Sequence, residues 1–177
     1  MKAIKDRLGR YLLNKHKENE KIKRSVTPFE YIKTIGVLYN AEMKENTKKI
    51  DKFCEELKHE GIKVIRLGYY DQKKIPEGVI PLHGDEFFSR KDIAWNGLPS
   101  KNIIGSFANQ EFDYLLNLYL KDIQPLLYTS ANSKAKFRIG KYNEAYTKCY
   151  DFMVDTTNNN TIEHLMKQTL HYLKTLK

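Results

Sequence analysis

The segment Ser133-Lys-Ala-Lys-Phe-Arg-Ile-Gly-Lys-Tyr142 carries the residue pattern best suited to binding chemistry. In an extended strand, its alternating basic and apolar side chains point to opposite sides. A row of cations can follow a phosphate backbone, and a tyrosine ring offers a surface on which a base can stack. The alternative is a solvated edge strand whose lysines prevent aggregation. The residues concerned are Lys134, Lys136 and Arg138, followed by Lys141 and Tyr142.

The first 24 residues hold a second set of basic side chains. They contain nine basic residues and three acidic ones, in a chain whose formal net charge is +9. A basic segment attached to a nearly neutral body is typical of an arm that binds polyanions. The nine residues are Lys2, Lys5, Arg7, Arg10, Lys15, Lys17, Lys21, Lys23 and Arg24.

Apolar spacing predicts that this arm is partly helical. Ile4, Leu8, Tyr11 and Leu12 fall on one side of a helix, so we expect a helix followed by a charged linker. We therefore divide the chain into a basic N-terminal arm, residues 1–26, and a domain, residues 27–177.

The elements of the domain alternate between strands and helices. Residues 34–39 and 63–69 are short apolar runs typical of buried strands, and helical spacing over 41–60 lies between them. Such a βαβ unit predicts parallel pairing with a right-handed crossover. We therefore predict an α/β fold, a single Rossmann-like three-layer sandwich with a mostly parallel sheet of about five strands.

The remaining pattern is less regular. Prolines and glycines predict a loop over 71–87, and Asn96-Gly97 predicts a turn with Trp95 beside it as a core anchor. We expect the other strands at 103–107, 114–119, 137–139 and 150–154, with helices over about 124–132 and from Thr161 onward.

Polar side chains that follow the predicted strands form a second candidate site. Ligands of open parallel sheets bind beyond the carboxyl ends of strands, which singles out Asn40, Asp71 and Asp122. The turn Tyr39-Asn-Ala-Glu42 has neither the glycines of a dinucleotide site nor the lysine of a P-loop, so we expect no cofactor. The histidines match no metal motif, and the two distant cysteines predict reduced thiols rather than a structural disulfide or a catalytic thiol.

Three stretches together resemble a known family. Glu111-Phe-Asp-Tyr-Leu-Leu-Asn-Leu118, Ser133 to Gly140 and Tyr150-Asp-Phe-Met-Val154 are similar to an uncharacterised family of small Bacteroidota proteins. The resemblance implies a cytoplasmic bacterial protein and brings no catalytic residues. Residues 112–140 also resemble the N-terminal Rossmann-like half of heptosyltransferase-type glycosyltransferases, although Asn117 stands where that family has an acidic residue.

These features favour a non-catalytic protein that binds RNA or a ribonucleoprotein, such as the ribosome, through the arm and the basic strand. One alternative is a small α/β enzyme or ligand-binding domain with its site at the strand ends. Another is an adaptor that binds a protein or an anionic membrane through the apolar side of the arm. No apolar run is long enough to cross a bilayer or to serve as a secretory signal, so we expect a cytoplasmic protein.

Overall fold

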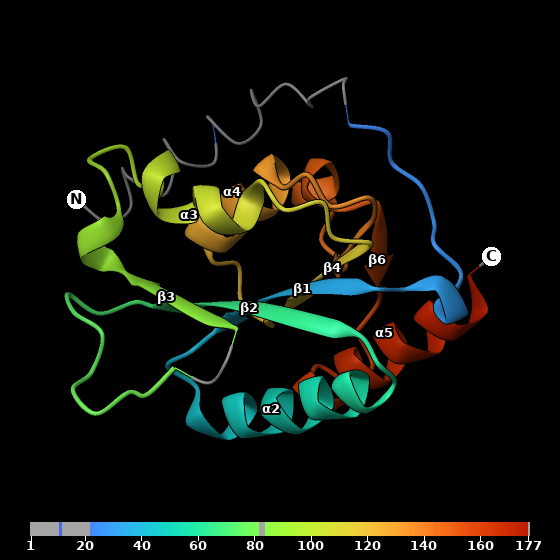
Figure 1. Cartoon of the computed structure of the whole chain (residues 1–177). Helices are drawn as coiled ribbons and strands as arrows, with labels where there is room; N and C mark the ends of the chain where they lie inside the picture. The colour runs from blue at the N-terminus through green and yellow to red at the C-terminus, as the bar shows by residue number, and fades with distance from the viewer. Residues whose placement is uncertain (1–10, 12–21, 82–83, 177) are drawn as a thin grey trace.

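A computed structural model describes residue 11, residues 22–81 and residues 84–176. These residues form a six-stranded, all-parallel sheet in the order β3-β2-β1-β4-β5-β6 (Figure 1). The predicted Rossmann-like α/β fold is confirmed, with six strands rather than about five. The strands are β1 (Thr34–Asn40), β2 (Lys63–Tyr70), β3 (Asp85–Ser89), β4 (Tyr114–Leu118), β5 (Arg138–Lys141) and β6 (Phe152–Val154).

Helices cover both faces of the sheet and complete three layers. Figure 1 shows one pair, α2 (Lys44–His59) and α5 (Ile162–Thr175), below the sheet, and the other pair, α3 (Lys101–Ala108) and α4 (Gln124–Asn132), above it. Three short 3-10 helices complete the fold: η1 (Phe29–Tyr31), η2 (Arg90–Asp92) and η3 (Glu144–Cys149). Within the described residues, no helix has the length and apolar character needed to span a bilayer.

The strands are apolar because both faces of the sheet are buried. Successive β1 residues alternate between two hydrophobic clusters, with Val37 and Tyr39 on the side of α2 and Leu38 on the side of α3. On β4, Leu115 and Leu116 divide in the same way.

All strands run in one direction, so the sheet has two chemically distinct edges. The amino edge, where the strands begin, lies to the right in Figure 1, and the carboxyl edge, where they end, lies to the left. The chain moves outward from β1 to β2 and β3, then returns to the other side of β1 with β4. The strand order therefore reverses between β1 and β4, where ligands of doubly wound sheets usually bind.

Three sequence-based expectations are wrong. Residues 85–89, which overlap the end of the loop expected over 71–87, form the edge strand β3, and residues 103–107 lie in α3 instead of a strand. The helical spacing of Ile104, Phe107 and Ala108 buries one side of α3, a pattern hidden by its two isoleucines. Trp95 does not anchor the core, since it is 79% exposed.

Candidate nucleic-acid interface

The root of the arm is fixed to the domain at the amino edge. Ser25 donates its backbone N–H to the carbonyl oxygen of Lys136 at 2.9 Å. The hydroxyl of Tyr114 donates to the carbonyl oxygen of Thr27 at 2.8 Å. The described root of the arm therefore lies beside the segment that leads into β5.

Arg24 docks the same segment through its side chain. Its guanidinium donates to the carbonyl oxygens of Ser133, at 3.2 Å, and Ala135. Its Nε lies 3.9 Å from a carboxylate oxygen of Asp151. Arg24 therefore contributes to docking, and the neighbouring Lys23 is the exposed cation at the root. The other expected arm contacts lie outside the described residues: Lys2, Lys5, Arg7, Arg10, Lys15, Lys17 and Lys21.

Lysines from several strands gather around this root. In a parallel sheet, the residues that precede each strand meet at one edge. Backbone hydrogen bonds show the alignment: Lys63 N–H donates to Lys33 O at 2.9 Å, and Lys33 N–H donates to Asp113 Oδ2 at 2.8 Å. Asp113 in turn accepts a hydrogen bond from Lys136 Nζ at 2.8 Å. We refer to Lys23, Lys33, Lys63, Lys134 and Lys136 as the amino-edge lysines.

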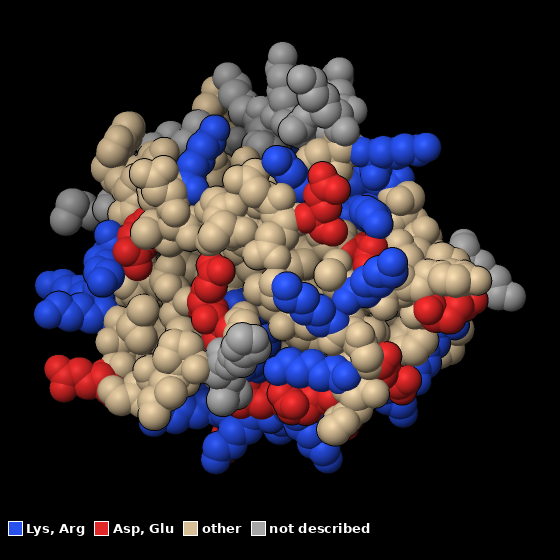
Figure 2. All heavy atoms as spheres, in the orientation of Figure 1, with Lys and Arg blue, Asp and Glu red and all other residues tan. Residues whose placement is uncertain are grey.

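The amino-edge lysines keep contact with solvent. Lys23, Lys33 and Lys63 are exposed, Lys134 is half-buried, and the side chain of Lys136 is 44% exposed. On the face shown in Figure 2, basic and acidic side chains are interspersed, and no continuous basic patch is seen there. The alignment of strand starts is what brings these lysines together.

Asp113 joins the starts of β1 and β5 at this edge through its carboxylate. Burial works to raise the pKa of its carboxyl group, but hydrogen bonds from Lys136 and from the backbone N–H groups of Lys33 and Thr34 outweigh burial. The net effect holds the pKa of Asp113 below its ordinary value, and the carboxylate remains charged at neutral pH.

Arg138 does not point outward as expected. Its side chain is 2% exposed, and its backbone N, Nε and Nη2 donate to the carboxylate of Asp151 at 2.8, 2.9 and 2.9 Å. Its Nη1 donates to the carbonyl oxygen of Lys148 at 3.1 Å. The alternative interpretation of this segment as an edge strand is also wrong, because β5 lies between β4 and β6. Helices cover both faces of the sheet at an interior strand, so the alternating side chains of β5 do not form a row of cations that faces solvent.

Lys141 and Tyr142 lie at the opposite edge of the sheet. Lys141 ends β5, and its Nζ donates to the carbonyl oxygen of Leu120 at 3.0 Å. Tyr142 is 51% exposed. The strand therefore separates these two residues from Lys134 and Lys136, and the single row expected from the sequence is divided between two edges.

The three residues of the predicted strand-end site lie at the ends of adjacent strands: Asp71 follows β2, Asn40 ends β1, and Asp122 comes after β4. Asn40 Oδ1 accepts the backbone N–H of Glu42 at 3.0 Å. Asp71 accepts a hydrogen bond from the hydroxyl of Tyr69 at 3.2 Å and pairs with Arg90 at 2.9 Å.

Asp122, the third residue of that site, accepts hydrogen bonds from Asn143 Nδ2 at 3.1 and 3.0 Å. Asn40 stabilises a local turn, whereas Asp71 and Asp122 link loops that are about 20 residues apart in sequence. None of the three lines the two hollows found in the described part of the chain.

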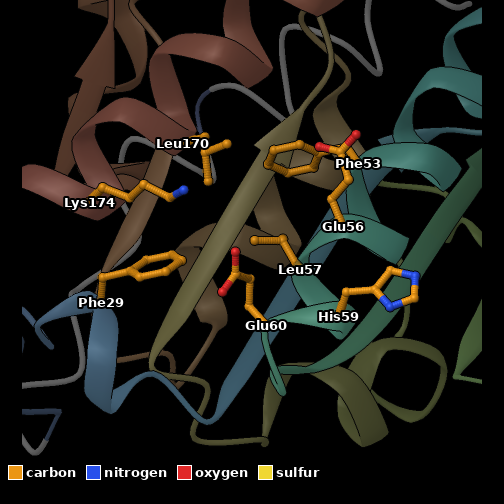
Figure 3. Close-up of a pocket in the computed structure, with 8 residues that line it drawn as sticks. All are labelled: Phe29, Phe53, Glu56, Leu57, His59, Glu60, Leu170 and Lys174. Atoms are coloured by element: carbon orange, nitrogen blue, oxygen red, sulfur yellow. The ribbon is translucent and has the colours of Figure 1, made fainter.

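One hollow, of about 300 Å³, lies between η1 and the ends of α2 and α5 (Figure 3). Its floor is apolar, and Lys174 Nζ lies 5.2 Å from the ring centre of Phe29. Glu56 and Glu60 line it, whereas His59 points away from its centre. Two carboxylates would repel phosphate, so this hollow does not extend a polyanion surface.

The second hollow, of about 490 Å³, adjoins the amino-edge lysines. Its lining includes the lysines Lys58 and Lys63 and the acids Asp85 and Glu86. Asp85 is engaged below the surface, where it forms an ion pair with the buried Arg66 at 2.6 Å. The hollow therefore offers space beside an amino-edge lysine.

Arg66 forms a buried ionic cluster that the sequence analysis did not identify. It pairs with Asp85 and Asp51 and lies 5.6 Å from the ring centre of Tyr39. Burial opposes its charge, but the hydrogen bonds that Arg66 donates to both aspartates outweigh burial and raise the pKa of Arg66. The cluster ties α2 to β2 and β3, and its burial assigns it a structural role.

The described residues offer no sign of thiol or metal chemistry. Burial raises the pKa of both cysteine thiols to about 12, which disfavours the nucleophilic thiolate. No group of three or more histidine, cysteine, aspartate or glutamate side chains in the described ranges is arranged to hold a metal ion.

Comparison with known proteins identifies a family and no function. A search of curated proteins found no match. A family profile described as a family of unknown function (DUF6913) matches residues 5–176, which is nearly the whole chain and includes most of the basic arm. The expectation of an uncharacterised family is confirmed, and the chain belongs to this family of unknown function.

Proposed function

We propose that this chain is a non-catalytic protein that binds RNA or a ribonucleoprotein, such as the ribosome, in the bacterial cytoplasm. The basic arm and the amino-edge lysines are its contact surface. One observation carries the proposal: the arm root is hydrogen-bonded to the Lys134–Lys136 segment, so two basic elements far apart in sequence lie side by side.

Electrostatics favours a polyanion as the partner of this surface. Lysines near phosphate groups release condensed counterions, which makes binding favourable and sensitive to salt. Two acids of this edge, Asp113 and Asp151, are held by Lys136 and Arg138, so these two do not cancel the charge of Lys23, Lys33, Lys63 and Lys134. Arg138 takes a supporting role in this arrangement, since it holds the segment that carries the lysines.

A matched pair of variants tests the proposal. The first replaces Lys33, Lys63 and Lys134 with glutamine, and the control replaces Lys48, Lys52 and Lys167, which lie on α2 and α5. Both variants lose the same charge from exposed or half-buried lysines.

RNA binding is measured by fluorescence anisotropy between about 50 and 200 mM salt. The slope of log affinity against log salt should fall by about 2 in the first variant, at about 0.7 for each phosphate contact to a single strand. It should remain unchanged in the control. Equal slopes for both variants would show that the amino-edge lysines are not the contact surface.

A second candidate function rests on the strand order. The reversal between β1 and β4 brings Asn40 and Asp122 to neighbouring strand ends, as a small-molecule site of an enzyme or ligand-binding domain would require. A thermal-shift screen with small metabolites would detect such a ligand, and Asp122→Asn should abolish the shift. The adaptor alternative depends on Ile4, Leu8 and Leu12, which lie outside the described residues.

A further inference from the structure

The only tryptophan of the chain is displayed to solvent. Trp95 is 79% exposed, whereas tryptophan is on average a highly buried residue. It lies in the connection between β3 and α3, at the carboxyl edge of the sheet. Trp95 therefore lies at the edge of the sheet opposite to the amino-edge lysines, on a second candidate binding surface.

The turn around Trp95 is held by several hydrogen bonds. Ala94 N–H donates to Leu98 O at 2.9 Å, and Gly97 N–H donates to Ala94 O at 3.0 Å. Asn96 Oδ1 accepts the backbone N–H of Leu98 at 3.2 Å, and Gly97 adopts a φ of +83° that favours glycine. The indole is therefore presented by an ordered turn.

The base of the turn is equally well fixed. Asp92 accepts the backbone N–H and the hydroxyl of Ser89 at 2.8 and 3.1 Å, and Ile93 forms a bridge with Pro99. Leu98 is buried beneath the turn. A rigid aromatic side chain loses little conformational entropy when it binds, which favours its use as a contact.

The segments that form this turn and lie against its base are rich in basic residues. Arg90 N–H donates to Gln72 O at 2.9 Å, which brings the loop after β2 against the base of the turn. Segments 71–75 and 89–101 together hold five basic and two acidic residues, with Glu77 further along the loop. Both acids are engaged, Asp71 by Arg90 and Asp92 by Ser89. The exposed lysines are Lys73, Lys74, Lys91 and Lys101.

We propose that the Trp95 turn binds single-stranded RNA, with an unpaired base stacked on the indole and the surrounding lysines beside the flanking phosphates. An aromatic face combined with nearby cations is the arrangement that single-stranded nucleic acids require. Basic side chains project at the left of Figure 2, on the side of the carboxyl edge. This inference rests on the proposed RNA-binding function and names unpaired RNA as the substrate class.

The single tryptophan makes the inference directly testable in the full-length protein. A single-stranded RNA of about 12 nucleotides, the same RNA as a duplex, and vesicles with anionic lipids serve as probes. Stacking should quench Trp95 emission with the single strand, along the same curve as the anisotropy of the labelled RNA. The duplex should quench far less, because its bases are already stacked.

Variants separate this inference from the proposed function. Trp95→Ala should weaken single-strand binding by about 5- to 150-fold, and Trp95→Phe should restore part of the loss. If anisotropy reports binding while emission is unchanged and Trp95→Ala binds equally well, the inference is wrong and the RNA-binding function stands. No anisotropy change with any RNA would overturn both. An emission shift with vesicles and none with RNA would overturn the inference in favour of a lipid surface.

Discussion

Replacing Asp151 with alanine would remove the main partner of the buried guanidinium of Arg138. The Arg138 side chain is 2% exposed and that of Asp151 is 14% exposed, and three donors of Arg138 converge on this one carboxylate. Breaking a buried ion pair from one side costs about 3–5 kcal/mol, because the remaining charge is left without compensation. For a domain of this size, that loss lowers the melting temperature by about 6–20 °C.

Thermal unfolding followed by circular dichroism measures this loss. Asp71→Ala is the matched control, since Asp71 pairs with Arg90 and their side chains are 39% and 52% exposed. An exposed pair contributes about 1 kcal/mol or less. The double variant with Arg138→Met should recover much of the stability, because an apolar replacement removes both buried charges. If Asp151→Ala were no less stable than Asp71→Ala, a structural role for Arg138 would be refuted.

Further predictions concern packing, pH and thiol reactivity. Gly140→Ala should destabilise the domain by about 1–3 kcal/mol in urea denaturation, because the new Cβ would lie 2.4 Å from the Tyr150 ring. Gly105→Ala, whose Cβ would approach no atom closer than 3.7 Å, should stabilise α3 by about 0.5–1 kcal/mol. A lower unfolding free energy for this variant would contradict the open space beside Gly105. The lowered pKa of Asp113 stabilises the folded state above about pH 4, and this stabilisation is lost as pH falls through the folded-state pKa. Asp113→Asn should therefore reduce the loss of unfolding free energy between neutral and acidic pH. Both cysteine thiols, with pKa values raised to about 12, should react with an aromatic disulfide only when the protein unfolds; fast labelling of the folded protein would argue against their burial.

The strands and long helices were predictable because local sequence records burial on both faces of a sheet. The apolar runs that became β1 and β2 flank a helix whose buried residues Ile50, Phe53, Cys54 and Leu57 match the 3.6-residue spacing. Short elements carry a weaker signal. In α3 only eight residues form the helix, and adjacent isoleucines resemble a strand.

Side-chain environment was less predictable than secondary structure. Alternation places Arg138 on one face of β5, but a partner 13 residues later in the sequence determines that this face is covered. Trp95 was expected in the core because of its size, whereas the hydrogen bonds of its turn hold it outside.

The amino-edge lysines did leave a signal in the sequence. Lys33 comes directly before one strand and Lys63 begins the next, and the parallel order of a βαβ unit places both residues at one edge.

The salt dependence of RNA binding by the full-length protein tests the central claim most directly. Contacts to a single strand from the four amino-edge lysines other than Lys136, which pairs with Asp113, predict a slope of about −2.8, so affinity should fall by about 50-fold between about 50 and 200 mM salt. Contacts from the arm would make the decline steeper. Affinity that does not change over this range, or no binding at the lowest salt, would contradict the claim that this edge meets a polyanion.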